Sequence, residues 1–149
     1  MERLAKNVEI RRIVPDATAA TTFILAAGTT DVNTGTIDTR GYNELTIIFM
    51  SGTMAASSSI DLALQYSDND SDWTAVTSGT TAQVTATDDN KVSVVNISDL
   101  QHRYYRLAVT RGDGGNATID GVIALLSKPV QAGVTQGSTV DDTLIMTNV

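Results

Sequence analysis

Apolar side chains take every second position in several segments of this chain. The clearest is the stretch 59–67, in which small or polar residues separate Ile60, Leu62 and Leu64. The stretch 104–111 repeats the pattern. A period of two places alternate side chains on opposite faces of a β-strand, whereas an amphipathic helix needs a period of about 3.6 residues. Both stretches are therefore predicted to be half-buried strands.

Three further segments depart from simple alternation. Residues 45–50 and 119–126 are apolar on both faces over part of their length, which is typical of central strands or of strands at an interface. In residues 92–97 the alternation changes phase at Val94 and Val95. A β-bulge would produce such a change, so one is predicted there.

Turn-forming residues separate these segments. Gly, Asn, Asp and Ser gather at 51–53, 67–72, 88–90 and 112–116. Such residues supply positive φ angles or hydrogen-bond their own backbone, so each group can reverse the chain between antiparallel strands. Thr, Ser, Val and Ile are abundant, and no window shows a convincing helical period. We predict an all-β fold, an antiparallel β-sandwich of jelly-roll-like form.

The length of 149 residues predicts one domain with two arms. Residues 23–128 are assigned to the sandwich, residues 1–22 to an N-terminal arm, and residues 129–149 to a C-terminal arm or docking strand. The C-terminal arm is polar until the apolar residues Leu144, Ile145 and Met146. A short apolar strand after a polar tail needs a sheet edge to dock on, its own or a neighbour's.

Charge and composition argue against several functions. Seventeen acidic residues stand against ten basic ones, for a net charge of −7, and such a surface repels nucleic acid. No apolar run reaches the roughly 18 to 20 residues that span a bilayer, and the first residues do not follow the signal-peptide pattern. The chain has no cysteine, so thiolate metal sites and disulfides are excluded. We expect neither a nucleic-acid nor a membrane partner.

Catalytic and metal-binding constellations are hard to assemble from this sequence. His102 is the single histidine and no G-x-S-x-G motif occurs, so we expect a packing role for His102. Residues 68–72 resemble the start of a calcium loop, but Trp73 stands where Gly is needed and Gly79 where a Glu is needed. We read this segment as a hairpin turn. We expect no enzyme activity, no catalytic residue, no metal site and no cofactor.

Exposed aromatic residues leave a second function open. Tyr42, Trp73 and Tyr104 are candidate surface platforms on which sugar rings could stack. The alternative hypothesis is therefore a carbohydrate-binding or adhesion β-sandwich module of a phage or cell-surface protein. It requires Trp73 or Tyr42 to lie in an exposed groove.

The N-terminal arm is locally basic on an acidic chain. Its basic residues outnumber its acidic ones and comprise Arg3, Lys6, Arg11 and Arg12. This asymmetry suits contact with an acidic partner surface or with a neighbouring subunit. We therefore predict that these four residues, and the apolar residues of the C-terminal arm, Leu144, Ile145 and Met146, contact a partner surface or a neighbouring subunit.

Motifs in chain order resemble the β-sandwich decoration, or cement, proteins of tailed-bacteriophage heads. They are an Asp-x-x-Gly-Tyr turn at 38–42, a hairpin over 60–76 that ends in Trp-Thr-x-Val, an Arg-Tyr-x-Arg strand at 103–110, and a late strand over 121–129 closed by a Pro. The resemblance covers about residues 35 to 130. The long arms depart from the family pattern.

The resemblance implies a structural virion protein. Such a protein is made in the host cytoplasm, binds the outer surface of the capsid and stabilises the shell by bridging neighbouring capsomers. Its implied partners are the major capsid protein of the same phage and further copies of itself, as a homotrimer.

Overall fold

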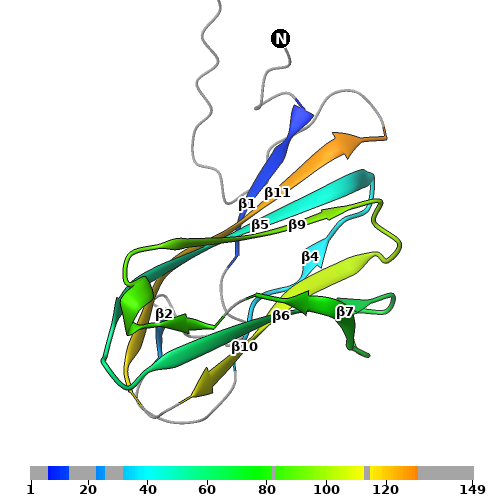
Figure 1. Cartoon of the computed structure of the whole chain (residues 1–149). Coiled ribbons are helices and arrows are strands. Elements are labelled where there is room, and N and C mark those ends of the chain that lie inside the picture. The colour runs from blue at the N-terminus through cyan, green and yellow to red at the C-terminus, as the bar shows by residue number, and fades with distance from the viewer. Residues whose placement is uncertain (1–6, 14–22, 26–31, 82, 113–114, 131–149) are drawn as a thin grey trace, which may run out of the picture.

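The computed structural model describes residues 7–13, 23–25, 32–81, 83–112 and 115–130. They form two layers of β-strands that face each other (Figure 1). The described elements are β1 (Glu9–Ile13), β2 (Phe23–Leu25), β3 (Val32–Asn33), β4 (Ile37–Asp38), β5 (Tyr42–Met54), β6 (Ser59–Ser67), β7 (Thr74–Thr80), β8 (Val84–Thr85), the 3-10 helix η1 (Ala86–Asp88), β9 (Val92–Ser98), β10 (Tyr104–Gly112) and β11 (Ala117–Pro129).

The strand order confirms the predicted all-β sandwich of jelly-roll form. The first sheet runs β1-β11-β5-β9 and the second runs β3-β10-β6-β7, with β2 added to β11, β4 to β10 and β8 to β6. All strand pairings among the described residues are antiparallel. We count β3 and β4 as one strand, leave β2 and β8 aside, and number the remaining strands 1 to 8 in chain order. The first sheet then has the strand order 1-8-3-6 and the second has the order 2-7-4-5. That is the strand order of a jelly roll.

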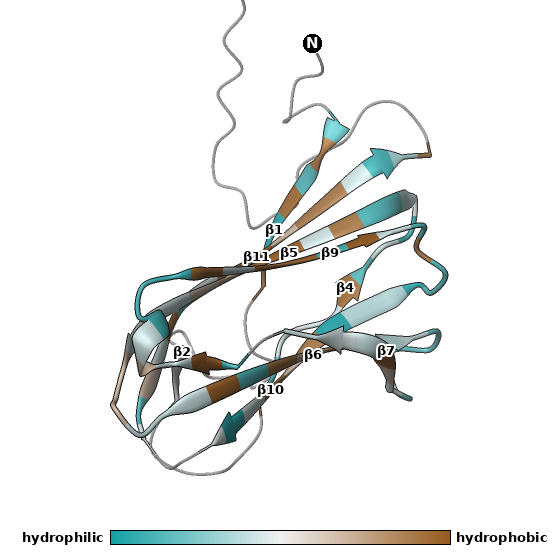
Figure 2. Cartoon of the chain, in the orientation of Figure 1, coloured by the Kyte–Doolittle hydropathy of each residue, from teal (hydrophilic) through white to brown (hydrophobic). Residues whose placement is uncertain are grey.

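Alternate residues of the central strands form the core between the sheets. Residues 59–67 coincide with β6, and Leu107 and Val109 on β10 are buried while Thr110 is exposed, as the period of two predicts. Both segments predicted to be apolar on two faces lie in the central pair β5 and β11. Figure 2 shows the apolar and polar bands that alternate along these strands. The largest fully buried apolar side chains are Phe49, Ile37, Leu45, Ile47, Ile60, Leu62, Leu107, Leu126, Val109 and Val122.

Part of the predicted N-terminal arm is a strand of the sheet. Residues 9–13 form β1 and pair with residues 122–126 of β11 along their whole length. Ile13 is buried in the core because it projects from the inner face of this strand. The rest of the predicted arms, including Arg3, Lys6 and the C-terminal Leu144, Ile145 and Met146, lies outside the described residues.

The bulge predicted at Val94 and Val95 is wrong. Strand β9 pairs with β5 in one unbroken register from Val92 to Ser98. The change of phase arises because Val92 and Val94 point outward although they are apolar, while Val95 points inward. The register shift on this side of the molecule lies instead between β6 and β7, where Ser78 has φ +61°.

Candidate protein-interaction surface

The two lateral sides of the sandwich are built differently. On one side, which we call the closed side, β1 of the first sheet faces β4 of the second. The Arg11 guanidinium lies on Glu9, with Nε 2.7 Å from Oε1, and donates through Nη1 to the Asp38 carbonyl oxygen at 2.8 Å. Arg103 Nη2 lies 2.8 Å from Asp38 Oδ2. Arg11 thus joins the edge strands of the two sheets.

Electrostatics on the closed side favour the charged forms of these carboxyls. Burial raises the pKa of the Glu9 carboxyl, but hydrogen bonds with Arg11 and Tyr42 outweigh burial, and the pKa lies below its usual value. The Arg103 hydrogen bond lowers the pKa of Asp38. Burial and the hydrogen bond to Glu9 raise the pKa of the Tyr42 hydroxyl to about 12. The polar groups of the closed side thus form a network in which the charged side chains have hydrogen-bond partners.

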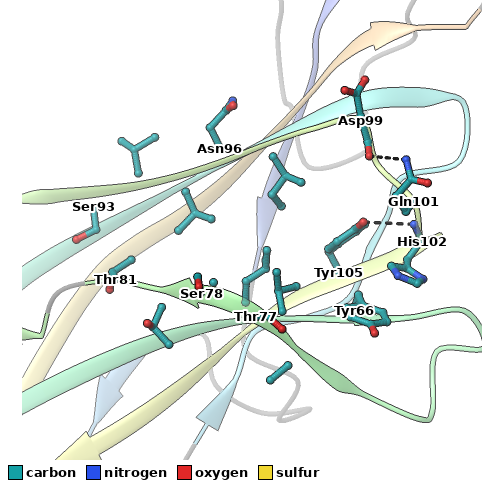
Figure 3. A pocket seen from close by; sticks show the side chains of 18 residues that line it. Tyr66, Thr77, Ser78, Thr81, Ser93, Asn96, Asp99, Gln101, His102 and Tyr105 are labelled. Atoms are coloured by element: carbon teal, nitrogen blue, oxygen red, sulfur yellow. Dashed lines mark hydrogen bonds between the residues drawn. The ribbon is translucent and has the colours of Figure 1, made fainter.

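The opposite side, where β9 faces β7, holds a groove of about 830 Å³, and we call it the open side. Apolar side chains from both sheets line its floor and walls, including Leu64, Val76, Val95 and Ile97. Ser93 and Thr77 lie on its rims, one on each edge strand (Figure 3). The core is therefore less completely covered here than on the closed side.

One end of the groove carries the single histidine. The His102 ring stacks on Tyr66 with centroids 3.7 Å apart, and its backbone N–H donates to the Tyr105 hydroxyl at 3.3 Å (Figure 3). Its Nδ1 lies 3.1 Å from Asp68 Oδ1. His102 packs the loop before β10 against two tyrosines, as expected from the sequence.

Strand β9 forms the upper rim of the groove and is an edge strand of the first sheet. Its seven residues, VSVVNIS, include no charge, no proline and no glycine. Val92 and Val94 are each 58% exposed. Natural edge strands are usually protected by charge, shortness or bulges, because open backbone groups recruit other strands. The other described edges have such protection: β1 carries charges, β3 and β4 have two residues each, and β7 has a shifted register.

The outer face of the first sheet carries an apolar patch among polar residues. Ile123, Ile48 and Val94 stand side by side across β11, β5 and β9. All described strands belong to the two sheets, so no described element covers this face. The apolar outward-facing residues of the first sheet are Ile10, Ile48, Met50, Val92, Val94, Ile123 and Leu125. A contiguous apolar sheet face of this kind is typical of a protein interface.

The predicted basic contact residues that are described lie on β1 and project to opposite faces of the sheet. Arg12 is exposed and projects to the outer face, whereas Arg11 projects inward and is held by Glu9 and Asp38. Residues two apart on a strand share a face, so the E-x-R spacing of Glu9 and Arg11 was a signal for this inward pair. The outward orientation of Val92 and Val94 was missed because the change of phase at Val94 and Val95 was attributed to a bulge.

The predicted sugar-stacking residues do not line the groove. The guanidinium of Arg106 lies 4.1 Å from the centroid of Trp73, and that of Arg103 lies 4.6 Å from the centroid of Tyr104. Each covers a ring face that a sugar would use. Tyr42 is half-buried.

The loop that resembles the start of a calcium site is a hairpin turn, as predicted. Asn69 Oδ1 accepts hydrogen bonds from the backbone N–H groups of Ser71 and Asp72, and Asn69 Nδ2 donates to Asp72. These bonds use the loop's polar groups to close the turn between β6 and β7. The described residues include no group of three or more His, Asp or Glu side chains that could hold a metal ion. Nor is any described helix long and apolar enough to cross a membrane.

Comparison with known proteins identifies a structural likeness. No family model matches the sequence, and no curated protein matches it. Among solved structures, the PBSX exported protein XepA superimposes with a TM-score of 0.51 at 18% sequence identity, and the match covers all of this chain and 45% of XepA. This chain thus spans less than half the length of XepA, and the likeness is one of fold.

Proposed function

We propose that this chain is a structural protein of a phage particle that binds the outer capsid surface and bridges neighbouring capsomers as a homotrimer. The observation that carries the proposal is the apolar outer face of the first sheet. Ile48 and Ile123 occupy its centre, pair with each other across β5 and β11, and are half-buried. A face of this kind is stable in water when another protein covers it.

Two further observations support this role. The motifs over residues 38–129 resemble head decoration proteins, and the fold is a jelly roll, an architecture that viral capsid domains use among others. XepA, a phage-associated exported protein, shares the fold. A decoration protein gains affinity by repeating one modest interface over a symmetric lattice, so it needs no catalytic group.

In this proposal the contacts come from the outer face and from both arms. Arg12 extends from the outer face of β1, next to the apolar residues, and Arg3 and Lys6 precede it in the chain. Leu144, Ile145 and Met146 supply apolar contacts to a capsid or trimer neighbour. Arg11 contributes to the fold instead, because its guanidinium is already bound. The protein is made in the host cytoplasm and resides on the virion surface.

The test is rebinding to expanded capsids from which the protein is absent. We expect the purified protein to elute as a trimer, to bind these capsids and to raise their disruption temperature. Ile123→Lys places a charge at the centre of the outer face and is expected to abolish binding. Thr110→Lys is the matched control, because Thr110 is an exposed strand residue on the second sheet.

Circular dichroism and melting curves establish that both variants fold. A wild-type monomer that leaves capsids unbound contradicts the proposal. Equal binding by the Ile123→Lys and Thr110→Lys variants removes the outer face as the contact surface.

A further inference from the structure

The structure points to a second copy of this chain as the partner of β9. We propose that the β9 strands of two copies pair antiparallel about a two-fold axis at Val95, which joins their first sheets into one continuous sheet. The inference rests on the described residues of the open side and does not require the phage role.

Along one side, the backbone of β9 pairs with no strand among the residues that the structure describes. The Ser51 N–H donates to the Lys91 carbonyl at 3.0 Å, which sets the phase of the ladder between β5 and β9. In an antiparallel ladder only alternate residues bond to a given neighbour, so the odd-numbered residues of β9 bond to β5. Val92, Val94, Asn96 and Ser98 therefore direct their N–H and C=O groups away from the sheet.

One antiparallel register satisfies all four of these residues. It places Val92 opposite Ser98 of the second copy and Val94 opposite Asn96, each as a hydrogen-bonded pair. Val95 then stands opposite Val95 on the axis, as a pair without hydrogen bonds, whose side chains approach most closely. A shift of two residues leaves part of β9 unpaired, because the strand has seven residues.

The charges that flank β9 favour the same arrangement. Lys91 precedes the uncharged strand and Asp99 follows it, and both are exposed. In the proposed register Lys91 of each copy comes opposite Asp99 of the other, so the two-fold axis generates two ion pairs. Parallel pairing would instead bring like charges together. The Lys91 side chain is 61% exposed beside Asp88, so its ammonium group is open to a second carboxylate.

Side chains on both faces of β9 suit this contact. Inward-facing Val95 and Ile97 line the groove, so pairing extends the half-covered core across the axis. Outward-facing Val92 and Val94 extend the apolar outer face over both copies. A contact made by one short strand per copy is small compared with the roughly 1,600 Å² of a stable interface. We therefore expect weak association in solution that becomes effective when copies are held together.

Cysteine trapping tests the register directly, because the natural chain has no cysteine. Val95→Cys is expected to give a disulfide-linked dimer under mild oxidation, because residue 95 of one copy lies opposite residue 95 of the other at the two-fold axis. Ile97→Cys is the matched control on the same face; it comes opposite Ser93 and is expected to form no disulfide-linked dimer. Equal cross-linking of the two variants, or faster cross-linking of Val94→Cys, overturns the register.

Charge exchange tests the flanking ion pairs. Lys91→Asp and Asp99→Lys each turn two attractions into repulsions, and each is expected to weaken the dimer about tenfold. The double variant is expected to restore wild-type association, as measured by sedimentation velocity over a concentration series. If neither single variant differs from wild type, the proposal fails.

One alternative occupant gives a different result. If deletion of residues 140–149 abolishes association and Val95→Cys stays monomeric, the C-terminal segment, and not a second β9, occupies this edge. Capsid rebinding is measured separately, so failure of the β9 contact and failure of the phage role can be distinguished.

Discussion

The closed and open sides of this sandwich differ in how the edge strands of the two sheets are joined. On each side an edge strand of the first sheet faces an edge strand of the second. On the closed side Arg11 forms an ion pair with Glu9 of its own strand β1 and links β1 to β4 through a hydrogen bond to the Asp38 backbone carbonyl. On the open side no charged residue lies within β9, and a groove exposes part of the core. Among the described residues, side chains of both sheets complete the closed side, whereas the open side leaves part of the core uncovered.

Removal of Arg11 is expected to have the largest effect. Arg11→Ala leaves Glu9 buried without its cation, and we expect a loss of about 2 kcal/mol in the free energy of unfolding. For a chain of this size that corresponds to a fall of about 6 °C in melting temperature. Arg12→Ala on the same strand is the control and is expected to change stability by less than about 0.5 kcal/mol. Similar losses in both variants would show that the closed side is not held by this network.

The turn that leads into β7 contributes less. Asn69→Ala removes the acceptor of the Ser71 and Asp72 backbone N–H groups, both of which are exposed to water. We expect a loss of about 1 kcal/mol, measured by urea unfolding. Ser71→Ala, which keeps the backbone donor, is expected to be nearly neutral. An Asn69→Ala variant as stable as wild type would mean that β7 is positioned by its pairing with β6 alone.

Acid should weaken the closed side. The pKa of Glu9 lies below its ordinary value of 4.5, so the contribution of this carboxylate is complete above pH 4.5 and is lost as the pH falls through the lower folded pKa. We expect wild type to lose stability relative to Glu9→Gln over this range, as followed by melting temperature. A constant difference between the two proteins across the titration would contradict a stabilising role for the charge.

The smallest effect on folding is expected on the open side. Val94→Thr replaces a methyl group by a hydroxyl at a position that is 58% exposed, and the strand propensity of the two residues is similar. We expect the melting temperature of the monomer to change by less than about 2 °C. A large loss would show that Val94 is covered within the monomer, which would make the open side a second closed one.

The sequence predicted those strands whose apolar residues alternate regularly. The bounds of β6 coincide with the predicted strand, and the buried face of β10 carries the residues that alternation selected. Strand β1 lies within the segment predicted to be an arm, in which Arg11 and Arg12 were predicted contact residues. The spacing of Glu9 and Arg11 places them on one face of a strand, and pairing with β11 shows that this face points inward.

The orientation of the valines of β9 is a second feature that local periodicity did not predict. The sequence of β9 contains an apolar phase change, and two physical causes can produce it: a bulge, or an outward row of valines. Local patterning does not distinguish them, because both give the same order of residues. The unbroken register with β5 shows that the valines point outward.

The sequence by itself determined that the chain forms many short antiparallel strands, carries no evident catalytic or metal-binding set, and has a basic start on an acidic body. Those properties follow from residue types and from a period of two, which are local. The tertiary structure decided which strands lie at the edges and which faces remain uncovered. Edge positions and open faces depend on pairings between residues far apart in the chain, such as Glu9 with Leu126 or Met50 with Val92, and no local pattern encodes them.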